Sequence, residues 1–196
     1  MNGTADGVGP CLVLVKHAQP VLDSSRPPRE WELGPDGEQQ ASRLAGMLRK
    51  FLPFHLVSSR EPKARRTSEI VGDRLGVATV AVEDLGELDR PAAPILSRQD
   101  HEAANARVFI DCDRAVMGAE SAASALDRFK RALSDLLDRT PPGNVVVITH
   151  GTVTALLVAD ANPSVDAFTL WKRLHCGSFV VLERGSLALR DVVDTA

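Results

Sequence analysis

The segment "CLVLVKHAQP" (residues 11–20) decides how the rest of the chain is interpreted. Five apolar residues lead into Lys16 and His17, and a proline follows three positions later. An unbroken apolar run of this length is typical of a strand that is buried on both faces. Where helices cover both faces of a parallel sheet, ligands bind at the carboxyl ends of the strands. His17 therefore occupies a position at which such a sheet carries its binding groups.

The rest of the chain alternates strand and helix patterns, which predicts an α/β fold with a sheet covered on both faces. Strand patterns cover residues 11–15, 55–59, 76–82 and 145–149, and helix patterns cover residues 36–51, 61–75 and 119–139 and two segments after residue 150. Residues 178–184 and 187–193, separated by Gly185 and Ser186, predict a closing β-hairpin.

The length of 196 residues fits a single domain, residues 1–196. Residues 1–10 lack the charged and apolar regions of a signal peptide, and we expect them to form a flexible tail. Residues 88–119 contain two prolines and Gly118 and lack a sustained period, apart from a helical patch at about 100–109. We expect this segment to be an irregular insertion over the active site.

Composition argues against several classes of function. A formal net charge of −3 and an aromatic content of 4% argue against a nucleic-acid partner. The longest apolar run is too short to span a bilayer, so we expect no membrane partner. The three widely spaced cysteines form neither a disulfide framework nor a CxxC pair, which favours a reduced, cytoplasmic setting. No residues show convincing metal-ligand spacing, and we expect neither a metal nor another cofactor.

A second histidine follows a buried-strand pattern, because "VVVITH" places His150 as "LVLVKH" places His17. A strand-end histidine on its own is more often a structural residue than a catalytic one. Both histidines, however, end strands of one predicted sheet, and the fold would bring the two imidazoles to the same edge. We therefore interpret His17 and His150 as parts of one site.

The segment "SSREPKARRTSEI" (residues 58–70) adds cations to that edge. A strand ends in two serines, and a helix then begins, whose N-terminus offers free N–H groups and a partial positive charge to an anion. We expect Lys63, which is closest to the strand exit, to turn inward, and Arg65 and Arg66 to lie on a solvated helix face. The two serines are expected to orient the pocket or to cap the helix.

The segment "EDLGELDRP" (residues 83–91) follows the third strand pattern and supplies an acid. Glu87 can serve as a general acid if a partly buried site raises its pKa, although an ordinary acidic surface loop explains the same pattern. Together these groups describe phosphoryl transfer. One imidazole attacks phosphorus, cations hold the equatorial oxygens, and the acid protonates the leaving oxygen.

The remaining histidines are assigned no chemistry. We expect His55 to be structural and His101, within residues 88–119, to be exposed. His175 precedes a strand, and by the strand-end rule it is expected at the opposite edge of the sheet from His17. Cys176 has no evident general base beside it and is expected to be a small buried residue.

At these residues the chain resembles the histidine phosphatase superfamily, the phosphoglycerate-mutase-like group. Residues 16–18, Lys-His-Ala, stand where the family has Arg-His-Gly, and residues 59–67 resemble its Ser-x-x-x-Arg-Ala-x-x-Thr signature, with a lysine at position 63. Residues 85–87 match its Leu-x-Glu motif, and residues 149–151 match its late Thr-His-Gly. The blocks keep the order of the family and together span nearly the whole chain.

The resemblance implies a three-layer α/β/α sandwich with a largely parallel sheet. It also implies that His17 is the nucleophile that accepts the phosphoryl group and that Glu87 is the proton donor. Lys16, Lys63 and His150 would form the phosphate pocket, without a metal. Both lysines stand where the family has arginine, so the positive charge is kept but the planar fork that binds two oxygens at once is lost.

We therefore expect a metal-independent phosphomonoester hydrolase that works through a phosphohistidine on His17. Its partner would be a phosphorylated small molecule or a phosphoprotein. One alternative is a phosphoglycerate-type mutase, which the shortness of the chain disfavours. The other is a non-catalytic phosphate-binding pseudo-phosphatase, which the two lysines keep in consideration. The edge of the C-terminal hairpin could support a homodimer.

Overall fold

The computed structural model describes residues 9–195, so most of the expected tail, residues 1–8, lies outside the described part of the chain. Gly9 and Pro10 are bound to the C-terminal hairpin. The Pro10 carbonyl accepts a hydrogen bond from the N–H of Arg184 at 3.0 Å, and the Gly9 carbonyl accepts one from Nη1 of Arg190 at 2.9 Å.

The fold is built on a six-stranded mixed sheet with the order β3-β2-β4-β1-β5-β6. Its strands are β1 (Cys11–Lys16), β2 (Phe54–Ser59), β3 (Thr79–Val82), β4 (Asn144–Thr149), β5 (Phe179–Glu183) and β6 (Leu189–Val193). The first four strands run parallel to one another, β5 is antiparallel to β1, and β6 is antiparallel to β5. The sheet is largely parallel, as predicted, and the predicted hairpin forms one of its edges.

Strands β1 and β4 lie side by side at the centre of the sheet, with Lys16 opposite Thr149. The apolar residues 12–15 and 145–148 are all 0% exposed. Valine, isoleucine and leucine fill both faces of these strands, as their unbroken apolar pattern predicts. Because the two strands end at the same level, the residues that follow them, His17 and His150, emerge next to each other.

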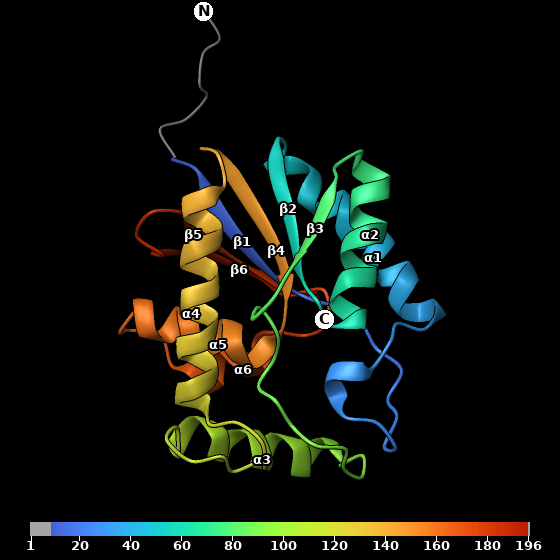
Figure 1. Ribbon diagram of the computed structural model, residues 1–196, viewed down its shortest axis with the longest axis vertical. Helices are drawn as coiled ribbons and strands as arrows, with labels where there is room; N and C mark the ends of the chain where they lie inside the picture. Colours follow the sequence, from blue (N-terminus) through green and yellow to red (C-terminus); the bar gives the residue numbers. More distant parts are fainter. Residues whose placement is uncertain (1–8, 196) are drawn as a thin grey trace, which may run out of the picture.

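Helices cover both faces of the sheet (Figure 1). On one face lie α1 (Pro35–Leu48) and α2 (Pro62–Leu75). On the other face lie α4 (Ala122–Arg139), α5 (Gly151–Ala161) and α6 (Ala167–Arg173). Two short 3-10 helices, η1 (Pro28–Glu30) and η2 (Arg49–Phe51), lie in the connections. Leu12 and Leu14 of β1 pack on the α4 side, and Val13 and Val15 pack on the α1 side. The predicted three-layer α/β/α sandwich is therefore confirmed. Among residues 9–195, no helix is long and apolar enough to cross a membrane.

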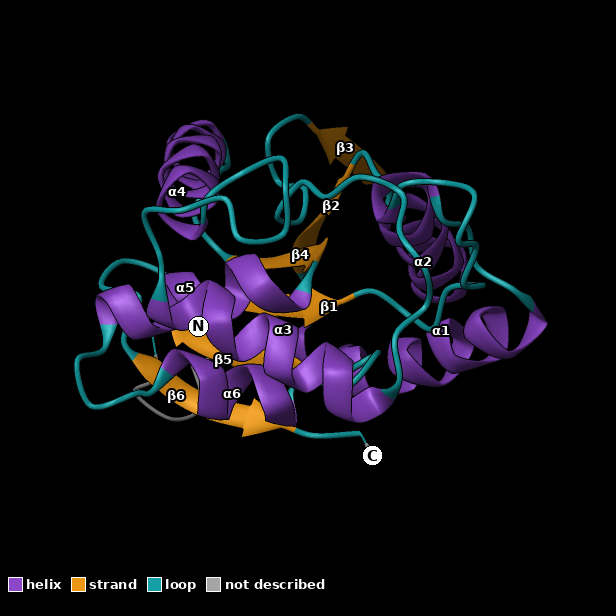
Figure 2. Ribbon diagram, turned by 90° about the horizontal axis from the view of Figure 1, so that it is seen from below, coloured by secondary structure: helices purple, strands orange, loops and turns teal. Residues whose placement is uncertain are grey.

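Residues 88–119 are less irregular than expected, because α3 (Arg98–Ile110) extends the predicted helical patch at both ends. The hydroxyl of Ser97 caps this helix by accepting a hydrogen bond from the N–H of Asp100 at 3.2 Å. The Phe109 ring lies 6.3 Å from the Trp171 ring of α6. Figure 2, viewed toward the carboxyl ends of the parallel strands, shows α3 lying across this end of the molecule beside α6. The segment therefore covers the end of the sheet that carries His17.

The expectation that His175 lies at the opposite edge from His17 was wrong. The strand-end rule holds for parallel strands, but β5, which follows His175, runs antiparallel to β1. The start of β5 therefore lies beside the end of β1, and the N–H of Lys16 donates to the carbonyl of Ser178 at 2.9 Å. His175 is consequently at the same end of the sheet as His17.

Gly37 marks a close approach between α1 and the chain just after His17. A Cβ atom at Gly37 would lie 2.1 Å from the carbonyl oxygen of Gln19, whereas a Cβ at Gly46 in the same helix would meet nothing within 4 Å. We predict that Gly37→Ala lowers the free energy of unfolding by about 1–3 kcal/mol, because backbone must shift to admit the methyl group. Gly46→Ala should raise it by about 0.5–1 kcal/mol through helix propensity. Urea unfolding measures the free energy of unfolding of both variants. If both substitutions changed it in the same direction, the close approach at Gly37 would be contradicted.

Candidate active site

His17 and His150 lie together at the carboxyl end of the sheet. The N–H of His17 donates to the carbonyl of Thr149 at 2.9 Å, which continues the pairing of β1 with β4 by one residue. The centroids of the two imidazole rings are 5.1 Å apart, and the ring planes meet at 63°. His17 is 6% exposed and His150 is 0% exposed. The structure thus brings both predicted histidines to one buried place.

One ring nitrogen of His17 is fixed as a hydrogen-bond donor. Nδ1 lies 2.7 Å from the carbonyl oxygen of Ala18, and because a carbonyl oxygen can only accept, Nδ1 must carry the hydrogen. A neutral His17 ring therefore has its lone pair on Nε2. Ala18 is held in turn, since its N–H donates to Oγ1 of Thr67 at 3.0 Å. The φ angle of Ala18 is not positive, so this position does not require a glycine.

Both imidazoles are held in the neutral form. Burial is the main cause that lowers the pKa of His17 well below its usual value, and the nearby His150 and Lys63 lower that pKa further. Burial likewise lowers the pKa of His150 well below its usual value, with Lys63 acting in the same direction and Glu87 opposing it. A neutral imidazole with a free Nε2 can act as a nucleophile.

Lys63 is turned inward, as predicted, and is only 4% exposed. Its ammonium donates to the carbonyl oxygen of Pro28 at 2.6 Å and to the carboxylate of Glu61. Since an ammonium has three N–H donors, one remains for another partner. Arg65 and Arg66 are exposed on the outer face of α2, also as predicted.

Glu61 is a site residue that was not predicted from the sequence. Its side chain is 11% exposed, and Oε1 accepts a hydrogen bond from the N–H of Glu87 at 2.7 Å and lies 3.4 Å from Nε2 of His150. The hydroxyl of Ser59 joins the group, 2.9 Å from Nε2 of His150, and accepts from the N–H of Glu61 at 3.1 Å. In the sequence Glu61 resembles any acidic residue at a helix start, where acidic residues are common, so no local signal marks it.

The other ring nitrogen of His150, Nδ1, is unpaired among the described residues. Within residues 9–195, Nδ1 of His150 is buried and has no hydrogen-bond partner. Buried polar atoms are nearly always paired, with protein, water or a ligand. A bound group with polar atoms could supply the missing partner.

The carboxylate of Glu87 lies at the N-terminus of α5, the helix that follows β4. Its carboxylate accepts hydrogen bonds from the N–H groups of Thr152 at 3.0 Å and Val153 at 3.2 Å. Burial by itself raises the pKa of Glu87, but His150, Arg90 and the N–H groups of Thr152 and Leu88 lower it by more, so the net pKa lies below its ordinary value. The raised pKa required for a resting general acid is therefore not found, and Glu87 is ionised at neutral pH.

Arg128 holds the loop that carries Glu87, and it was not predicted either. From α4, its guanidinium donates to the carbonyl oxygens of Asp84 at 2.8 Å, Gly86 at 3.2 Å and Glu87 at 3.0 Å. It also pairs with the carboxylate of Glu120 at 2.8 Å. This role rests on contacts between residues more than 40 positions apart, which no local pattern reveals.

Lys16 contacts a different part of the protein from Lys63. Its ammonium donates to the carbonyl oxygen of Leu174 at 2.7 Å. Gly151 makes room for this side chain, because a Cβ there would lie 3.3 Å from Nζ of Lys16. Lys16 also contributes to the lowered pKa of His17, after burial and the effects of other neighbours, so its charge acts on the site.

Arg90 is a third cation near the site. Within the described residues its Nε is buried and has no hydrogen-bond partner, and Nη1 lies 3.9 Å from the sulfur of Met117. His101 is an exposed residue, as predicted, but its ring lies 5.5 Å from that of Trp171. Partial burial of the ring and the charge of Arg90 lower the pKa of His101. Arg90 is thus close to α3, which covers this end of the sheet.

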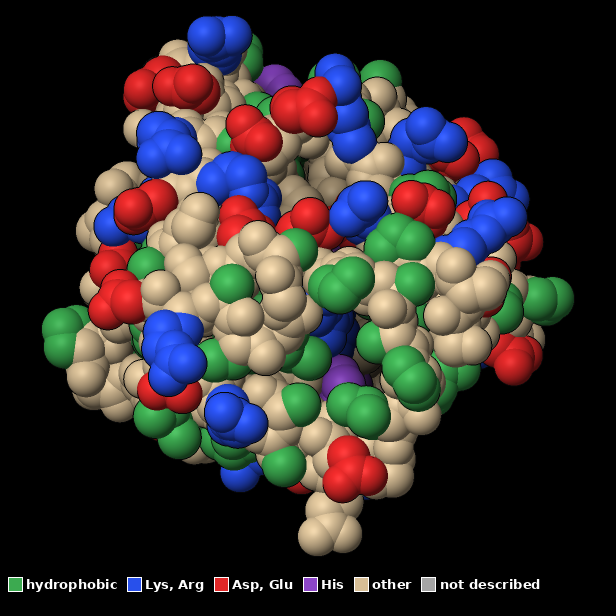
Figure 3. Space-filling view, turned by 60° about the horizontal axis from the view of Figure 1, so that its bottom comes forward, with side chains coloured by type: hydrophobic (Ala, Val, Ile, Leu, Met, Phe, Trp, Pro, Cys, Tyr) green, Lys and Arg blue, Asp and Glu red, His purple; other side chains and the backbone are tan. Residues whose placement is uncertain are grey.

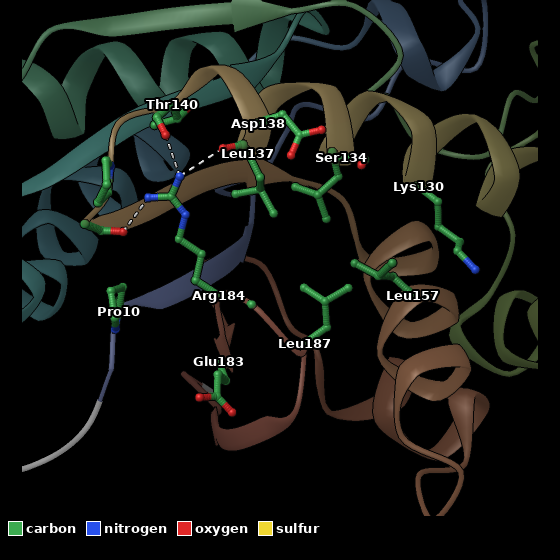
Figure 4. Close-up of a pocket in the computed structure, with 14 residues that line it drawn as sticks. Pro10, Lys130, Ser134, Leu137, Asp138, Thr140, Leu157, Glu183, Arg184 and Leu187 are labelled. Carbon is green, nitrogen blue, oxygen red and sulfur yellow. Dashed lines mark hydrogen bonds between the residues drawn. The ribbon is translucent and has the colours of Figure 1, made fainter.

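The face that carries these groups is hollowed. Figure 3 shows a recess with a Lys or Arg side chain and a histidine at its floor, surrounded by hydrophobic side chains. A separate groove lies between the end of α4 and the β5–β6 hairpin (Figure 4), where Arg184 donates to the carbonyls of Leu137 at 3.0 Å and Thr140 at 2.6 Å. That guanidinium is engaged with the end of a helix, and no histidine lines the groove. The candidate active site is therefore the group of residues around His17 and His150 at the carboxyl end of the sheet.

Comparison with known proteins agrees with this geometry. The family model of the histidine phosphatase superfamily (branch 1) matches residues 12–191. The chain belongs to the histidine phosphatase superfamily. Phosphoglycerate mutase-like protein 4 of Arabidopsis thaliana is 29% identical over 167 residues, which cover 78% of this chain and 71% of that protein. A probable phosphoglycerate mutase of Erwinia tasmaniensis is 24% identical over 156 residues, 76% of this chain and 73% of that protein.

Solved structures of histidine phosphatases share the fold. The mycobacterial glucosyl-3-phosphoglycerate phosphatase superposes with a TM-score of 0.76 at 22% identity, over 96% of this chain and 100% of that chain. The α-ribazole phosphatase of Shigella flexneri gives a TM-score of 0.69 at 18% identity, over 94% of this chain and 96% of that chain. At these identities the likeness establishes the three-layer architecture.

The two buried imidazoles predict a pH-dependent stability. Because folding lowers their pKa from about 6.5, the folded protein binds fewer protons than the unfolded chain below that pH. The free energy of unfolding should therefore fall as the pH drops from about 6.5 toward 5, by up to roughly 1.4 kcal/mol per pH unit for each histidine. Denaturant unfolding of His17→Asn/His150→Asn should show a flatter dependence, whereas His55→Asn, on an exposed position of β2, should match the wild type. An unchanged slope in the double variant would contradict the prediction.

Proposed function

We propose that this protein hydrolyses phosphomonoesters through a phosphohistidine on His17. The observation that carries the proposal is the hydrogen bond from Nδ1 of His17 to the carbonyl of Ala18, which leaves the lone pair of a neutral, buried ring on Nε2. Nε2 attacks phosphorus, and the bond from phosphorus to the leaving oxygen breaks. Water then attacks the phosphohistidine, so that phosphate leaves and His17 is restored.

The phosphoryl oxygens would be held by donors that the protein leaves open. Lys63 has one uncommitted N–H, and Nδ1 of His150 has no partner among the described residues. Lys16 and Arg90 add positive charge as negative charge spreads over the equatorial oxygens. These groups are all supplied by the chain, so the proposed mechanism uses no metal. The favoured substrate is a phosphorylated small molecule, with a phosphoprotein as the other choice.

Glu87 would protonate the leaving oxygen. In the free protein its pKa lies below its ordinary value, so only a small fraction carries the proton at neutral pH. His17, whose pKa also lies well below its usual value, remains a neutral nucleophile when the pH falls. The lowered pKa of Glu87 and the lowered pKa of His17 together favour catalysis at a pH below 7.

A phosphoglycerate-type mutase is the second candidate. It is favoured by the names of two relatives, a phosphoglycerate mutase-like protein and a probable phosphoglycerate mutase, at 29% and 24% identity. A mutase must keep its phosphohistidine until the phosphoryl group returns to a sugar acid. Incubation with 3-phosphoglycerate and its bisphosphate separates the two, since isomerisation faster than phosphate release would favour the mutase.

A pseudo-phosphatase that binds phosphate without turnover is the third candidate. It is favoured by the engagement of both pocket lysines, because Lys63 already binds Glu61 and the carbonyl of Pro28, and Lys16 binds the carbonyl of Leu174. Charge-assisted hydrogen bonds contribute about 1.5–3 kcal/mol each, so the loss of two arginine forks could weaken catalysis greatly. This candidate would be favoured if the protein turned over none of a broad panel of phosphoesters while inorganic phosphate still raised its melting temperature.

The central prediction concerns His17. We predict that the purified protein hydrolyses p-nitrophenyl phosphate in the presence of EDTA and that His17→Asn reduces the rate to background, because the nucleophile is lost. Wild-type protein is mixed with a phosphoester that carries a labelled phosphoryl group, and the reaction is stopped rapidly without acid. The protein should then carry label that is stable to base and labile to acid, as expected of phosphohistidine. His55→Asn is the control. Full turnover by His17→Asn would exclude the proposed nucleophile.

The second prediction concerns pH. For an alkyl phosphate, whose leaving group needs a proton, kcat/KM should rise as the pH falls from 8 toward 5, because protonated Glu87 becomes more abundant while His17 stays neutral. Glu87→Gln should lower kcat/KM by about 10²–10⁴-fold and flatten the profile, with a smaller loss for p-nitrophenyl phosphate. Asp89→Asn, which changes an exposed carboxylate paired with Arg29, is the control. A profile that Glu87→Gln leaves unchanged would remove Glu87 from the role of proton donor.

A further inference from the structure

Glu61 stands at a helix start, where acidic residues are common, but its carboxylate does not bind the helix. It is the residue before the first turn of α2, and its side chain makes no capping hydrogen bond to that helix. The carboxylate instead turns away, with one oxygen on the ammonium of Lys63 and the other on the N–H of Glu87 at 2.7 Å. Helix capping therefore does not explain the residue, and its contacts lie with the proposed phosphate site.

The neighbouring loop is shaped to admit this carboxylate. A Cβ atom at Gly86 would lie 3.0 Å from Oε1 of Glu61, closer than side chains normally pack. Gly86 is the middle residue of the Leu85–Glu87 motif, and its φ is not in the left-handed region, so backbone conformation does not demand glycine there. A larger residue at position 86 would therefore press on the carboxylate of Glu61.

Glu61 also organises the groups that surround it. Lys63 is 4% exposed, and a lysine is a point charge on a flexible stem that needs acceptors to fix its direction. The carboxylate of Glu61 and the carbonyl of Pro28 provide two such acceptors and leave one N–H. Oε1 of Glu61 lies 3.4 Å from Nε2 of His150, and Ser59 binds both residues. One carboxylate thus contacts both the cation and the second imidazole.

We propose that Glu61 is a positioning residue of the phosphate site, which directs the Lys63 ammonium toward the phosphoryl oxygens and so compensates for the arginine fork that the lysine lacks. The inference rests on the proposed function for the identity of the ligand. It assigns Glu61 no contact with the substrate, because its effect passes through the side chain of Lys63. Glu61 and Lys63 are then a functional pair, and neither works fully without the other.

A double-mutant cycle tests the pair. Glu61→Gln keeps the size of the side chain and removes its charge, Lys63→Met removes the ammonium, and the double variant removes both. We expect Glu61→Gln to lower kcat/KM for p-nitrophenyl phosphate by about 10–100-fold, and to reduce the rise in melting temperature caused by inorganic phosphate. In the background of Lys63→Met, the same change should cost less than about threefold in activity. Glu83→Gln, which alters an exposed carboxylate paired with Arg60, should leave activity and phosphate binding unchanged.

The outcomes separate the inference from its alternatives. If Glu61→Gln strengthens phosphate binding and leaves kcat within twofold, Glu61 only repels the anion and the inference is wrong. If the losses in the cycle multiply, Glu61 does not act through Lys63 and the inference is also wrong. Should Glu61→Gln fail to fold because a buried ammonium is left without its counter-charge, the comparison of the double variant with Lys63→Met still decides.

The inference and the proposed function can fail separately. A wild-type protein that turns over phosphoesters while Glu61→Gln behaves like Glu83→Gln overturns the inference alone. A wild-type protein that lacks turnover but is stabilised by phosphate overturns hydrolysis, and the phosphate-induced shift of Glu61→Gln then tests the pair. A wild-type protein that shows neither turnover nor stabilisation by phosphate overturns both.

Discussion

The parallel pairing of β1 with β4 is the constraint on which the site depends. The register sets Lys16 opposite Thr149 and continues through the hydrogen bond from the N–H of His17 to the Thr149 carbonyl. Because side chains alternate between the faces of a sheet, a shift of one residue would reverse every side chain of the strand and separate the two imidazoles. Such a shift would also move methyl-rich side chains that are now fully buried, so packing of the core fixes the geometry of the site.

Charged groups at the site are held by partners that suit their shapes. Arg128 uses its planar fork on three loop carbonyls and the carboxylate of Glu120, which fixes the loop that carries Glu87. Lys63 stands where the family has an arginine and uses two of its donors on Glu61 and on the carbonyl of Pro28. A buried charge without a partner would be costly, so these contacts also let the charges stay inside the fold.

The features that could be predicted from the sequence are those that depend on neighbouring residues, namely the buried strands and the residues at their ends. Unbroken apolar runs predicted the central strands, and the strand-end rule brought His17 and His150 to one edge. Glu61 and Arg128 escaped prediction because their importance lies in contacts with distant segments. His175 was misplaced because strand direction depends on the topology of the hairpin, which no apolar pattern encodes. The lowered pKa of Glu87 was not predicted, because one of the N–H groups that lower it belongs to Thr152 of α5, 65 residues away along the chain.

The low pKa of Glu87 and its proposed role as an acid are linked through the start of α5. The helix begins at Gly151, so its free N–H groups lie beside His150 and attract negative charge, which Glu87 supplies in the free protein. Under the proposed function, a phosphoester brings a second negative charge into the same field. Like charges that share a site raise the pKa of the weaker acid, so binding of substrate would itself favour protonation of Glu87. The free protein then keeps the carboxylate ionised and in place, and the proton arrives with the anion that requires it.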